Sequence, residues 1–276
     1  MTGVRQEALP QGEVLRARVR ATWTAGDFGR IAVGYEEGAA AFIERLGLKP
    51  GDQVLDVACG TGNLALPAAR AGARVTGIDI APALVVQLAA RAAAEGLTLE
   101  AREGDAEALP FADDSFDTVV TMFGAMFAAH PHQAANELLR VTRPGGRIAM
   151  ANWTPEGFVG RMLKLTVGYV PPPAGVPSAL LWGNPRAVEE RLGAGLSDLR
   201  FERLAMVLAY PFGPEETVEL FRTWYGPTVR AFAALEEERQ PKFFDDLVRL
   251  WTEHNTAGPN GTRVESEFLA VVGTRA

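Results

Sequence analysis

The sequence predicts an α/β protein in which helices cover both faces of a mainly parallel sheet. Short β-rich apolar runs alternate with helical stretches between about residue 53 and residue 153, and this alternation is typical of parallel strands joined by crossover helices. The composition agrees, because 47% hydrophobic and 22% charged residues are ordinary values for a globular protein. A chain of 276 residues can also bury a substantial core within one domain.

An amphipathic helix is expected before the alternating region. Apolar side chains recur there at spacings of three and four residues, namely Phe28, Ile31, Ala32, Tyr35, Ala39, Phe42, Ile43 and Leu46. The turn-forming run Lys49-Pro50-Gly51-Asp52 then ends the helix. The first dozen residues show no such pattern, so we expect them to be loosely held.

Five strands are expected in the alternating region, at 53–58, 74–79, 97–103, 116–122 and 147–153. The helix after the first strand should run to about Gly72, and the next should begin at Pro82, because proline suits a first helical turn. A third helix is expected at 133–141. The run 144–146, Pro-Gly-Gly, supplies the turn before the fifth strand.

The pattern loosens after Pro155. The prolines at positions 171–173 and 177 predict a stiff connector that no helix can cross, and we expect an insertion or lid to begin there. A short helix should run from Asn184 to about Leu192.

Two more strands are expected near the C-terminal end of the chain. They are placed at 199–209 and 264–273, on either side of a helical block from Pro214 to about His254. We interpret this block as a cap and not as a separate domain.

Charge and cysteine content narrow the classes of function. With 27 basic against 34 acidic residues the net charge is −7, so we expect neither a nucleic acid nor an anionic membrane as partner. No apolar run reaches the roughly 18–20 residues that a membrane span requires. The single cysteine, Cys59, cannot form an internal disulfide, which predicts a cytoplasmic location. The three histidines have no metal-ligand spacing, so no metal is expected.

A glycine-rich turn follows the first strand and predicts a ligand crevice. Gly60 and Gly62 let the backbone approach a ligand closely. Asp79, seventeen residues after Gly62 and at the end of the second strand, has a carboxylate suited to the two hydroxyls of a ribose. Open α/β sheets bind ligands at the carboxyl ends of their strands. These observations together predict a nucleoside cofactor.

Four segments in order resemble the motifs of one family. VLDVACGTGNLALPAAR at 54–70, GIDIAP at 77–82, GDAEALPFADDSFDTVV at 104–120 and LLRVTRPGGRIAMANW at 138–153 are similar to the successive motifs of the class I S-adenosylmethionine (SAM)-dependent methyltransferases. The resemblance covers about 40–155 and looks nearest to the ubiquinone/menaquinone-biosynthesis-type branch, which acts on small molecules. It implies a Rossmann-like fold with seven strands, the last antiparallel, and a helical cap.

The resemblance also implies a cofactor site. Its positions are Asp56, Gly60, Thr61, Gly62, Asn63, Asp79, Ile80, Asp105, Ala106, Met122 and Phe123. Asp56 would orient the amino group of SAM, Asp79 would bind its ribose hydroxyls, and Asp105 would accept a hydrogen bond from its adenine. Met122 and Phe123 would line the methyl-donor end. Ala58 and Cys59 stand where many relatives have a glycine, which makes this turn slightly less free.

The domain organisation follows from the resemblance. We expect one methyltransferase domain over 1–276, made of an N-terminal helical lid segment (1–50), a SAM-binding core (51–155) and a substrate-side cap with the last two strands (156–276). Aromatic side chains that are candidates for an acceptor pocket are Trp23, Phe28, Tyr35, Trp153, Trp182, Trp224 and Tyr225.

The implied activity is in-line methyl transfer from SAM to an O, N or C atom of a small molecule, with S-adenosylhomocysteine as product. His130 is the one candidate general base, because it lies shortly after the expected donor pocket. Two alternatives stay open: the same glycine turn fits the looser dinucleotide fingerprint of a nicotinamide-dependent oxidoreductase, and the lack of an assignable base fits a non-catalytic SAM-binding module. A homodimer is a further expectation.

Overall fold

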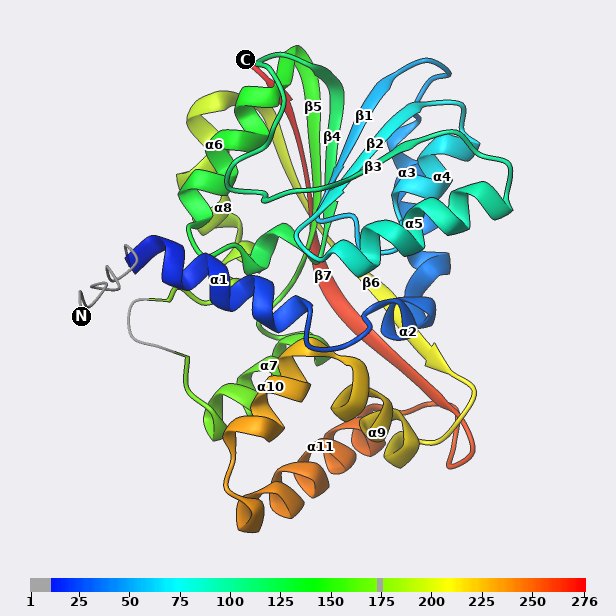
Figure 1. Cartoon of the computed structure of the whole chain (residues 1–276), viewed down its shortest axis with the longest axis vertical. Coiled ribbons are helices and arrows are strands. Elements are labelled where there is room, and N and C mark those ends of the chain that lie inside the picture. Colours follow the sequence, from blue (N-terminus) through cyan, green and yellow to red (C-terminus); the bar gives the residue numbers. More distant parts are fainter. Residues whose placement is uncertain (1–10, 173–175) are drawn as a thin grey trace, which may run out of the picture.

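The computed structural model describes residues 11–172 and 176–276 (Figure 1). Most of the N-terminal stretch that we expected to be loose lies outside the described residues, as does Pro173 of the expected connector. Gln11 and Gly12, the last two residues of that stretch, belong to a helix.

Seven strands form one mainly parallel sheet, as the sequence predicts. The strands are β1 (Gln53–Val57), β2 (Arg74–Asp79), β3 (Glu100–Glu103), β4 (Phe116–Met122), β5 (Thr142–Trp153), β6 (Leu196–Tyr210) and β7 (Thr262–Arg275). Their order is β3-β2-β1-β4-β5-β7-β6, and β7 is antiparallel to both of its neighbours. The chain order reverses between β1 and β4, so the carboxyl ends of these two strands border the crevice in which such sheets bind ligands.

Helices cover both faces of this sheet (Figure 1). The bounds are α1 (Gln11–Trp23), α2 (Gly29–Ala32), α3 (Glu36–Leu46), α4 (Ala65–Arg70), α5 (Pro82–Ala94), α6 (Pro131–Val141), α7 (Phe158–Tyr169), α8 (Pro185–Leu192), α9 (Pro214–Trp224), α10 (Gly226–Ala234) and α11 (Gln240–His254). Helices α4 and α5 pack on the β1–β3 half, and α6 and α8 pack near β4–β6. Buried apolar strands such as β1, with Val54, Leu55 and Val57 fully enclosed, form the core between them.

The helix expected at 28–46 is broken into three pieces. A 3₁₀ turn, η1 (Val33–Tyr35), separates α2 from α3, and Tyr35 leaves the helical region with φ −141°. The break occurs where the chain crosses a long strand: a Cβ at Gly34 would lie 2.4 Å from Cζ of Tyr210. The Tyr210 hydroxyl donates a hydrogen bond to the Ile31 carbonyl at 2.9 Å. Tertiary packing therefore overrides the continuous helical periodicity.

The structure changes four other expectations. The bounds of helix α1 and helix α7 were not predicted, and α7 occupies a region in which the pattern loosened. The fifth strand begins at Thr142, before the Pro-Gly-Gly run, whereas the third is shorter than expected and begins at Glu100. A strand can extend past such a run where its neighbour supplies ladder partners, and β4 pairs with Thr142 through a register shift.

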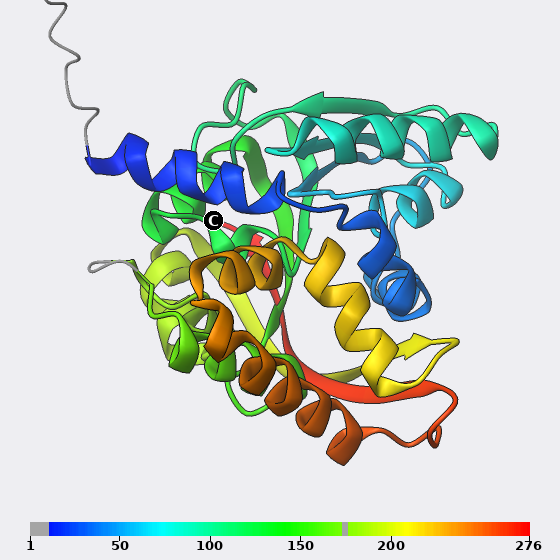
Figure 2. The same cartoon turned by 60° about the horizontal axis from the view of Figure 1, so that its bottom comes forward.

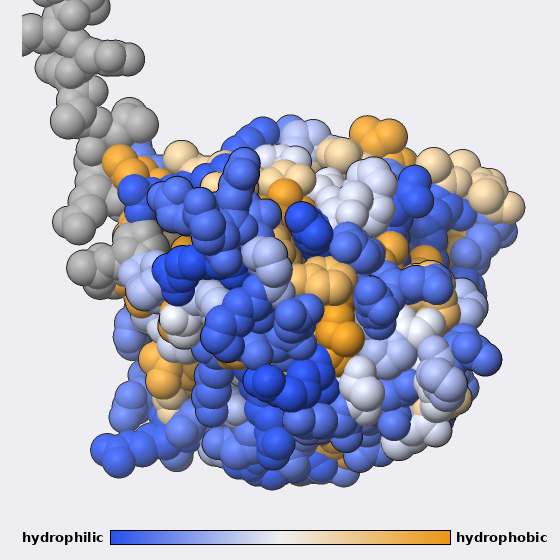
Figure 3. All heavy atoms as spheres, turned by 90° about the horizontal axis from the view of Figure 1, so that it is seen from below, coloured by the Kyte–Doolittle hydropathy of each residue, from blue (hydrophilic) through white to orange (hydrophobic). Residues whose placement is uncertain are grey.

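A helical cap lies beyond the carboxyl edge of the parallel strands. The long strands β6 and β7 extend past the sheet and carry α9, α10 and α11, while α7 packs against α11 (Figures 1 and 2). Helix α1 crosses between the sheet and this cap (Figure 2). The outer face of the cap is largely hydrophilic, with small apolar patches near its centre (Figure 3).

Two classes of feature are missing from the described part of the chain. No helix there has the length and apolarity of a membrane span. Nor do the side chains placed in residues 12–172 and 176–276 bring together three His, Cys, Asp or Glu groups in a way that would hold a metal ion.

Candidate active site

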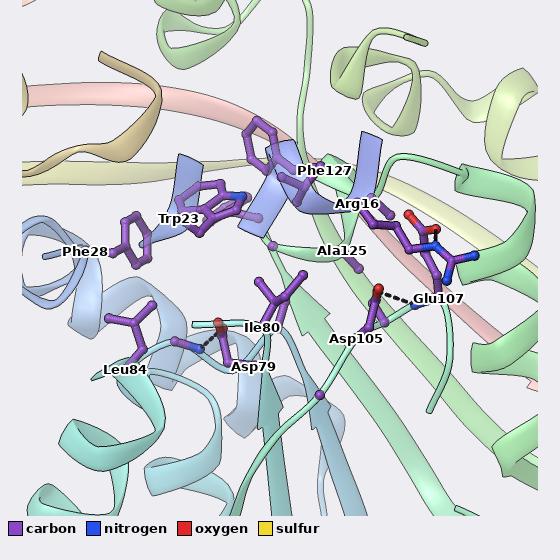
Figure 4. A pocket seen from close by; sticks show the side chains of 18 of the residues that line it. Arg16, Trp23, Phe28, Asp79, Ile80, Leu84, Asp105, Glu107, Ala125 and Phe127 are labelled. Carbon is purple, nitrogen blue, oxygen red and sulfur yellow. Dashed lines mark hydrogen bonds and ion pairs between the residues drawn. The ribbon is translucent and has the colours of Figure 1, made fainter. Parts of the chain in front are cut away.

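The main cavity lies where β1, β2 and β4 end and α1 covers the sheet. It holds about 690 Å³ of space free of protein atoms, including its mouth. Its lining residues are Arg16, Val19, Trp23, Phe28, Ala58, Gly60, Asp79, Ile80, Leu84, Gly104, Asp105, Ala106, Glu107, Met122, Phe123, Gly124, Ala125, Phe127 and Ala128. Figure 4 shows Asp79, Ile80 and Asp105 on one side and the rings from α1 and its neighbours on the other.

The glycine-rich turn forms one wall of the main cavity. Gly60 and Gly62 have positive φ values of +53° and +95°, which favour glycine. A Cβ at Gly62 would lie 2.4 Å from Cδ1 of Leu88, so close packing of α5 also excludes a larger residue there. A Cβ at Gly60 would face only the Phe28 ring, at 3.6 Å. Ala58 also has φ +57°, and this left-handed alanine stores roughly 1–2 kcal/mol of strain.

Asp56 lies behind this turn and is the most unusual charged group in the site. Its side chain is 1% exposed, and Oδ2 has no hydrogen-bond partner in the described chain. Burial raises the pKa of Asp56 well above its ordinary value, while the backbone N–H of Ala65 opposes this shift. Asp56 lines a narrow cavity next to the main one, together with Gly60, Asn63 and Met122. An unpaired buried carboxylate of this kind fits a cationic ligand group and disfavours an anionic one.

Asp79 closes the turn from the end of β2. Its Oδ2 accepts a hydrogen bond from the Gly60 N–H at 2.8 Å, and its Oδ1 accepts one from the Ala81 N–H at 2.9 Å. Burial raises its pKa, and these backbone donors oppose the rise. A carboxylate has more acceptor positions than these backbone donors occupy. Asp79 therefore both braces the loop and remains able to bind ligand hydroxyls.

Asp105 combines a turn with a place in the cavity wall. Its Oδ1 accepts a hydrogen bond from the Glu107 N–H at 2.9 Å, which is the local turn geometry that the sequence Gly-Asp favours. The residue nevertheless lines the main cavity beside Ala106, on the same side as Ile80 (Figure 4). Partial burial raises its pKa. Asp105 therefore both forms the turn and lines the main cavity.

Two of the expected cofactor positions have other contacts. The carbonyl and hydroxyl of Thr61 accept hydrogen bonds from Arg91 at 3.0 and 3.3 Å, and Thr61 is not part of the main cavity wall. Asn63 donates to the Ala32 carbonyl at 2.9 Å and reaches only the narrow cavity. Their side chains hold the turn against α5 and α2.

Met122 and Phe123 lie at the end of β4, in the wall of the main cavity. Phe123 has φ +57° and stacks on Trp153 with ring centroids 3.5 Å apart. This strained conformation aims the ring across the end of the sheet, and such strain concentrates at functional sites. Phe123 also lines a second cavity that adjoins the main one.

An aromatic cavity adjoins the main cavity at this point. It comprises about 350 Å³ of space free of protein atoms, including the solvent at its mouth, and is lined by Trp23, Phe28, Ile31, Tyr35, Phe123, Phe127, Trp153, Val159, Met162, Leu208, Phe221 and Tyr225. It shares Phe28 and Phe123 with the main cavity and Tyr35 with the narrow cavity. Five of the seven aromatic residues expected in an acceptor pocket thus line one space, whereas Trp182 and Trp224 do not line it.

A larger outer cavity continues on the far side of α1. It holds about 1780 Å³ including its open mouth, and it shares Val19, Trp23, Phe127 and Ala128 with the main cavity. Most of the surface that lines it is apolar, with contributions from α1 and α7.

The sequence analysis expected a helical lid in the first 50 residues and named Trp23 as a pocket candidate, but it missed Arg16 and Val19 of α1. Arg16, Val19 and Trp23 of this helix line the main cavity, and Figure 4 shows Arg16 and Trp23 in its wall. An available signal was the spacing of Leu15, Val19 and Trp23, which are four residues apart and share one helical face. Arg16 pairs with the buried Glu107 at 3.1 Å and so fixes the helix over the cavity.

His130 lies outside the walls of the main and aromatic cavities. Its Nδ1 is 2.6 Å from Oε2 of Glu107, so Nδ1 carries the proton of this hydrogen bond. The Nε2 edge faces α1, since a Cβ at Gly12 would lie 3.3 Å from it. The structure therefore places His130 in a contact that holds α1 and α6 together.

Replacing His130 with alanine is expected to leave SAM affinity within about twofold of wild type. The unfolding free energy should fall by about 1–3 kcal/mol, because the buried Glu107 carboxylate loses a charge-assisted hydrogen bond. Titration calorimetry and chemical denaturation measure the two quantities, with the exposed His132→Ala as matched control. A loss of SAM affinity in the folded His130 variant would instead place this residue in the cofactor site.

Comparisons with known proteins define the class. Residues 54–146 match the family described as "Methyltransferase domain". The chain is 43% identical to an uncharacterised protein of Mycobacterium tuberculosis, over 87% of this chain and 93% of the relative. It is 33% identical to the demethylmenaquinone methyltransferase of Thermus thermophilus, over 57% of this chain and 79% of that enzyme. The YcgJ protein of Bacillus subtilis shares the fold, with a TM-score of 0.59 at 17% identity over 87% of this chain and 98% of that one.

Fold and site define an α/β protein that binds a nucleoside cofactor bearing a positive charge. The chain belongs to the class I SAM-dependent methyltransferases. It is therefore a SAM-dependent methyltransferase and not a nicotinamide-dependent oxidoreductase. An unpaired buried carboxylate such as that of Asp56 is also compatible with a cationic cofactor such as SAM.

Proposed function

We propose that the enzyme methylates an apolar small molecule that binds in the aromatic cavity. The observation that carries this proposal is the shared wall: Phe28 and Phe123 line both the main cavity and the aromatic cavity. A molecule in the aromatic cavity therefore lies next to the end of the main cavity at which Met122 and Phe123 are expected to surround the methyl donor. The apolar outer cavity adds space for further apolar groups near Trp23 and Phe127.

The cofactor would extend through the main and narrow cavities in a single orientation. Asp56 would pair with its amino group, and Gly60 and Gly62 would allow its methionine part to approach the backbone. Asp79 would bind the ribose hydroxyls. Asp105, the Ala106 N–H and Ile80 would surround the adenine. The supporting observations are the unpaired Oδ2 of Asp56 and the positions of the other groups along one continuous set of walls.

The bound cofactor supplies a methyl group that is already activated on a sulfonium sulfur. The chain has to hold the acceptor in line with that group and keep water away, and alignment alone is worth up to roughly 7–11 kcal/mol in the best intramolecular cases. Rings that meet edge to face, such as Trp23 with Phe127 at 5.0 Å and Tyr35 with Phe123 at 5.9 Å, provide a stiff dry wall for this purpose.

The residues that line the aromatic cavity also restrict which kind of acceptor atom can act as the nucleophile. No His, Lys, Asp or Glu of the described chain lines it, and its only ionisable groups are the phenols of Tyr35 and Tyr225. Burial raises the pKa of both phenols far above the ordinary value, so neither becomes a base near neutral pH. The acceptor atom is therefore one that attacks without losing a proton to these walls, such as an electron-rich carbon, a neutral amine or an anion formed before binding.

Incubation with methyl-labelled SAM and a metabolite extract tests this proposal. The extract is first divided by polarity, and label should appear in the organic-soluble fraction. Val159→Phe, which adds volume inside the aromatic cavity, should lower the labelling rate about tenfold and leave SAM affinity within about twofold, because only acceptor alignment suffers. Label confined to water-soluble products would contradict an apolar acceptor, and no labelled product from any extract would contradict methylation of a small molecule.

A further inference from the structure

Three tyrosines surround the acceptor end of the site, and they differ in how their hydroxyls are used. Tyr35, Tyr210 and Tyr225 are 7%, 5% and 5% exposed. The Tyr210 hydroxyl donates to the Ile31 carbonyl at 2.9 Å. Within the described part of the chain the hydroxyls of Tyr35 and Tyr225 make no such hydrogen bond, and neither belongs to the fully buried polar atoms that lack a partner. Phenol hydroxyls in a protein interior usually find a partner, so two hydroxyls that border open space without one are available to a ligand.

Both unpartnered tyrosines line the aromatic cavity. The rings of Tyr35 and Tyr225 each lie 6.3 Å from the ring of Phe28, which forms part of the wall shared with the main cavity. Tyr35 further borders the narrow cavity that contains Asp56. All the other residues that line the aromatic cavity have apolar side chains or, in Trp23 and Trp153, indole rings. The two hydroxyls are therefore the main polar groups available to a bound acceptor.

The protonation state of these hydroxyls determines which ligand atom they select. Because burial raises both pKa values, each phenol keeps its proton and can donate a hydrogen bond. A donor in an otherwise apolar pocket favours a ligand with an oxygen at that point and rejects an analogue without one, since the hydroxyl would then remain unpaired.

We propose that the hydroxyls of Tyr35 and Tyr225 bind an oxygen atom of the methyl acceptor. The acceptor is then an apolar molecule that carries a carbonyl, hydroxyl or oxyanion close to the methylated atom. This assignment rests on the proposed function of the aromatic cavity as the acceptor site. Both tyrosines are positioning residues, because they hold the acceptor and exchange no proton with the reacting atoms.

A pair of small probes tests the assignment without knowledge of the natural acceptor. Acetophenone and isopropylbenzene have the same heavy-atom connectivity, and the first has a carbonyl oxygen where the second has a methyl group. Binding of each probe is measured by titration calorimetry on the enzyme saturated with S-adenosylhomocysteine. Tyr35→Phe and Tyr225→Phe should each raise the Kd of acetophenone about threefold to tenfold and leave that of isopropylbenzene within about twofold, since only one hydrogen bond is lost.

Tyr210→Phe is the matched control, because its hydroxyl is already bound to the backbone. It should leave the ratio of the two Kd values unchanged even if it lowers stability. Acetophenone affinities that are unaffected in both Phe variants would overturn the assignment, as would a Tyr35→Phe variant that loses SAM affinity, which would place that hydroxyl on the cofactor. Binding of neither probe to the wild-type complex would instead refute the aromatic cavity as acceptor site.

Discussion

Replacing Asp56 with asparagine is expected to weaken SAM binding roughly 30-fold or more while it stabilises the protein without ligand. The loss of affinity follows because a buried charge pair with the amino group of SAM is broken, a change that typically costs about 2–5 kcal/mol. The gain in stability follows because Asp56 is buried with an unpaired oxygen. The asparagine side chain fills the same volume without a charge, so the unfolding free energy at neutral pH should rise by about 1–3 kcal/mol.

The pH dependence provides an internal check on the Asp56 prediction. Burial raises the pKa of the Asp56 carboxyl in the folded protein, so this group favours the folded protein at low pH. That contribution is complete below the ordinary carboxyl pKa of about 4 and is lost as the pH rises through the raised folded value. The advantage of the Asn variant should therefore grow from pH 4 to pH 8. Denaturation with and without SAM measures both effects, and a variant that is less stable than wild type at every pH would contradict the unpaired-charge interpretation.

Replacing Asp79 with alanine is expected to weaken SAM binding by roughly 1–3 kcal/mol, or about 5- to 150-fold, because the ribose hydroxyls lose a charged partner. The upper part of this range is expected, because the Gly60 and Ala81 N–H groups lose their acceptors as well. Asp79→Asn should be nearly as severe. Its amide has one acceptor atom for two backbone donors, so one N–H faces another N–H.

A comparison of two ligands distinguishes the contribution of Asp79 to the loop structure from its contribution to ribose binding. S-adenosylhomocysteine and its 2′-deoxyribose analogue are titrated against wild type and Asp79→Ala. The wild-type enzyme should prefer the ribose form by about tenfold, and the variant should lose most of this preference, because the two changes remove the same contact. A preference of equal size in the folded variant would show that Asp79 acts on the loop alone.

Much of the central sheet was predictable from the sequence. The expected strands at 74–79 and 116–122 coincide with β2 and β4, and the expected helix up to Leu192 coincides with α8. Strands buried on both faces appear as short apolar runs, and Pro at a first helical turn marks where a helix begins. The same rules did not predict helix α7, which lies outside the sheet. The apolar face of this helix was recognisable only from its packing against α11.

The candidate site, like the fold, was predictable from the sequence only in part. The turn with Gly60 and Gly62 and the carboxylates at the strand ends were foreseen because parallel strands bring their carboxyl ends to one edge. The outward direction of Thr61 toward Arg91 was not foreseen. Nor was the pairing of His130 with Glu107, since these residues are 23 positions apart and meet only when α6 packs on the sheet.

The sequence by itself determined the class of the protein, because its ordered motifs lie in contiguous strand–turn–helix units whose geometry is local. Only the tertiary structure formed the aromatic cavity that we propose as the acceptor site. There α1, β4, β5, the long β6 and the cap helices meet around Phe123, Tyr35 and Tyr225, from positions up to some 200 residues apart. Contacts at such separations depend on how complete elements pack, and the periodicity of a single segment does not encode them.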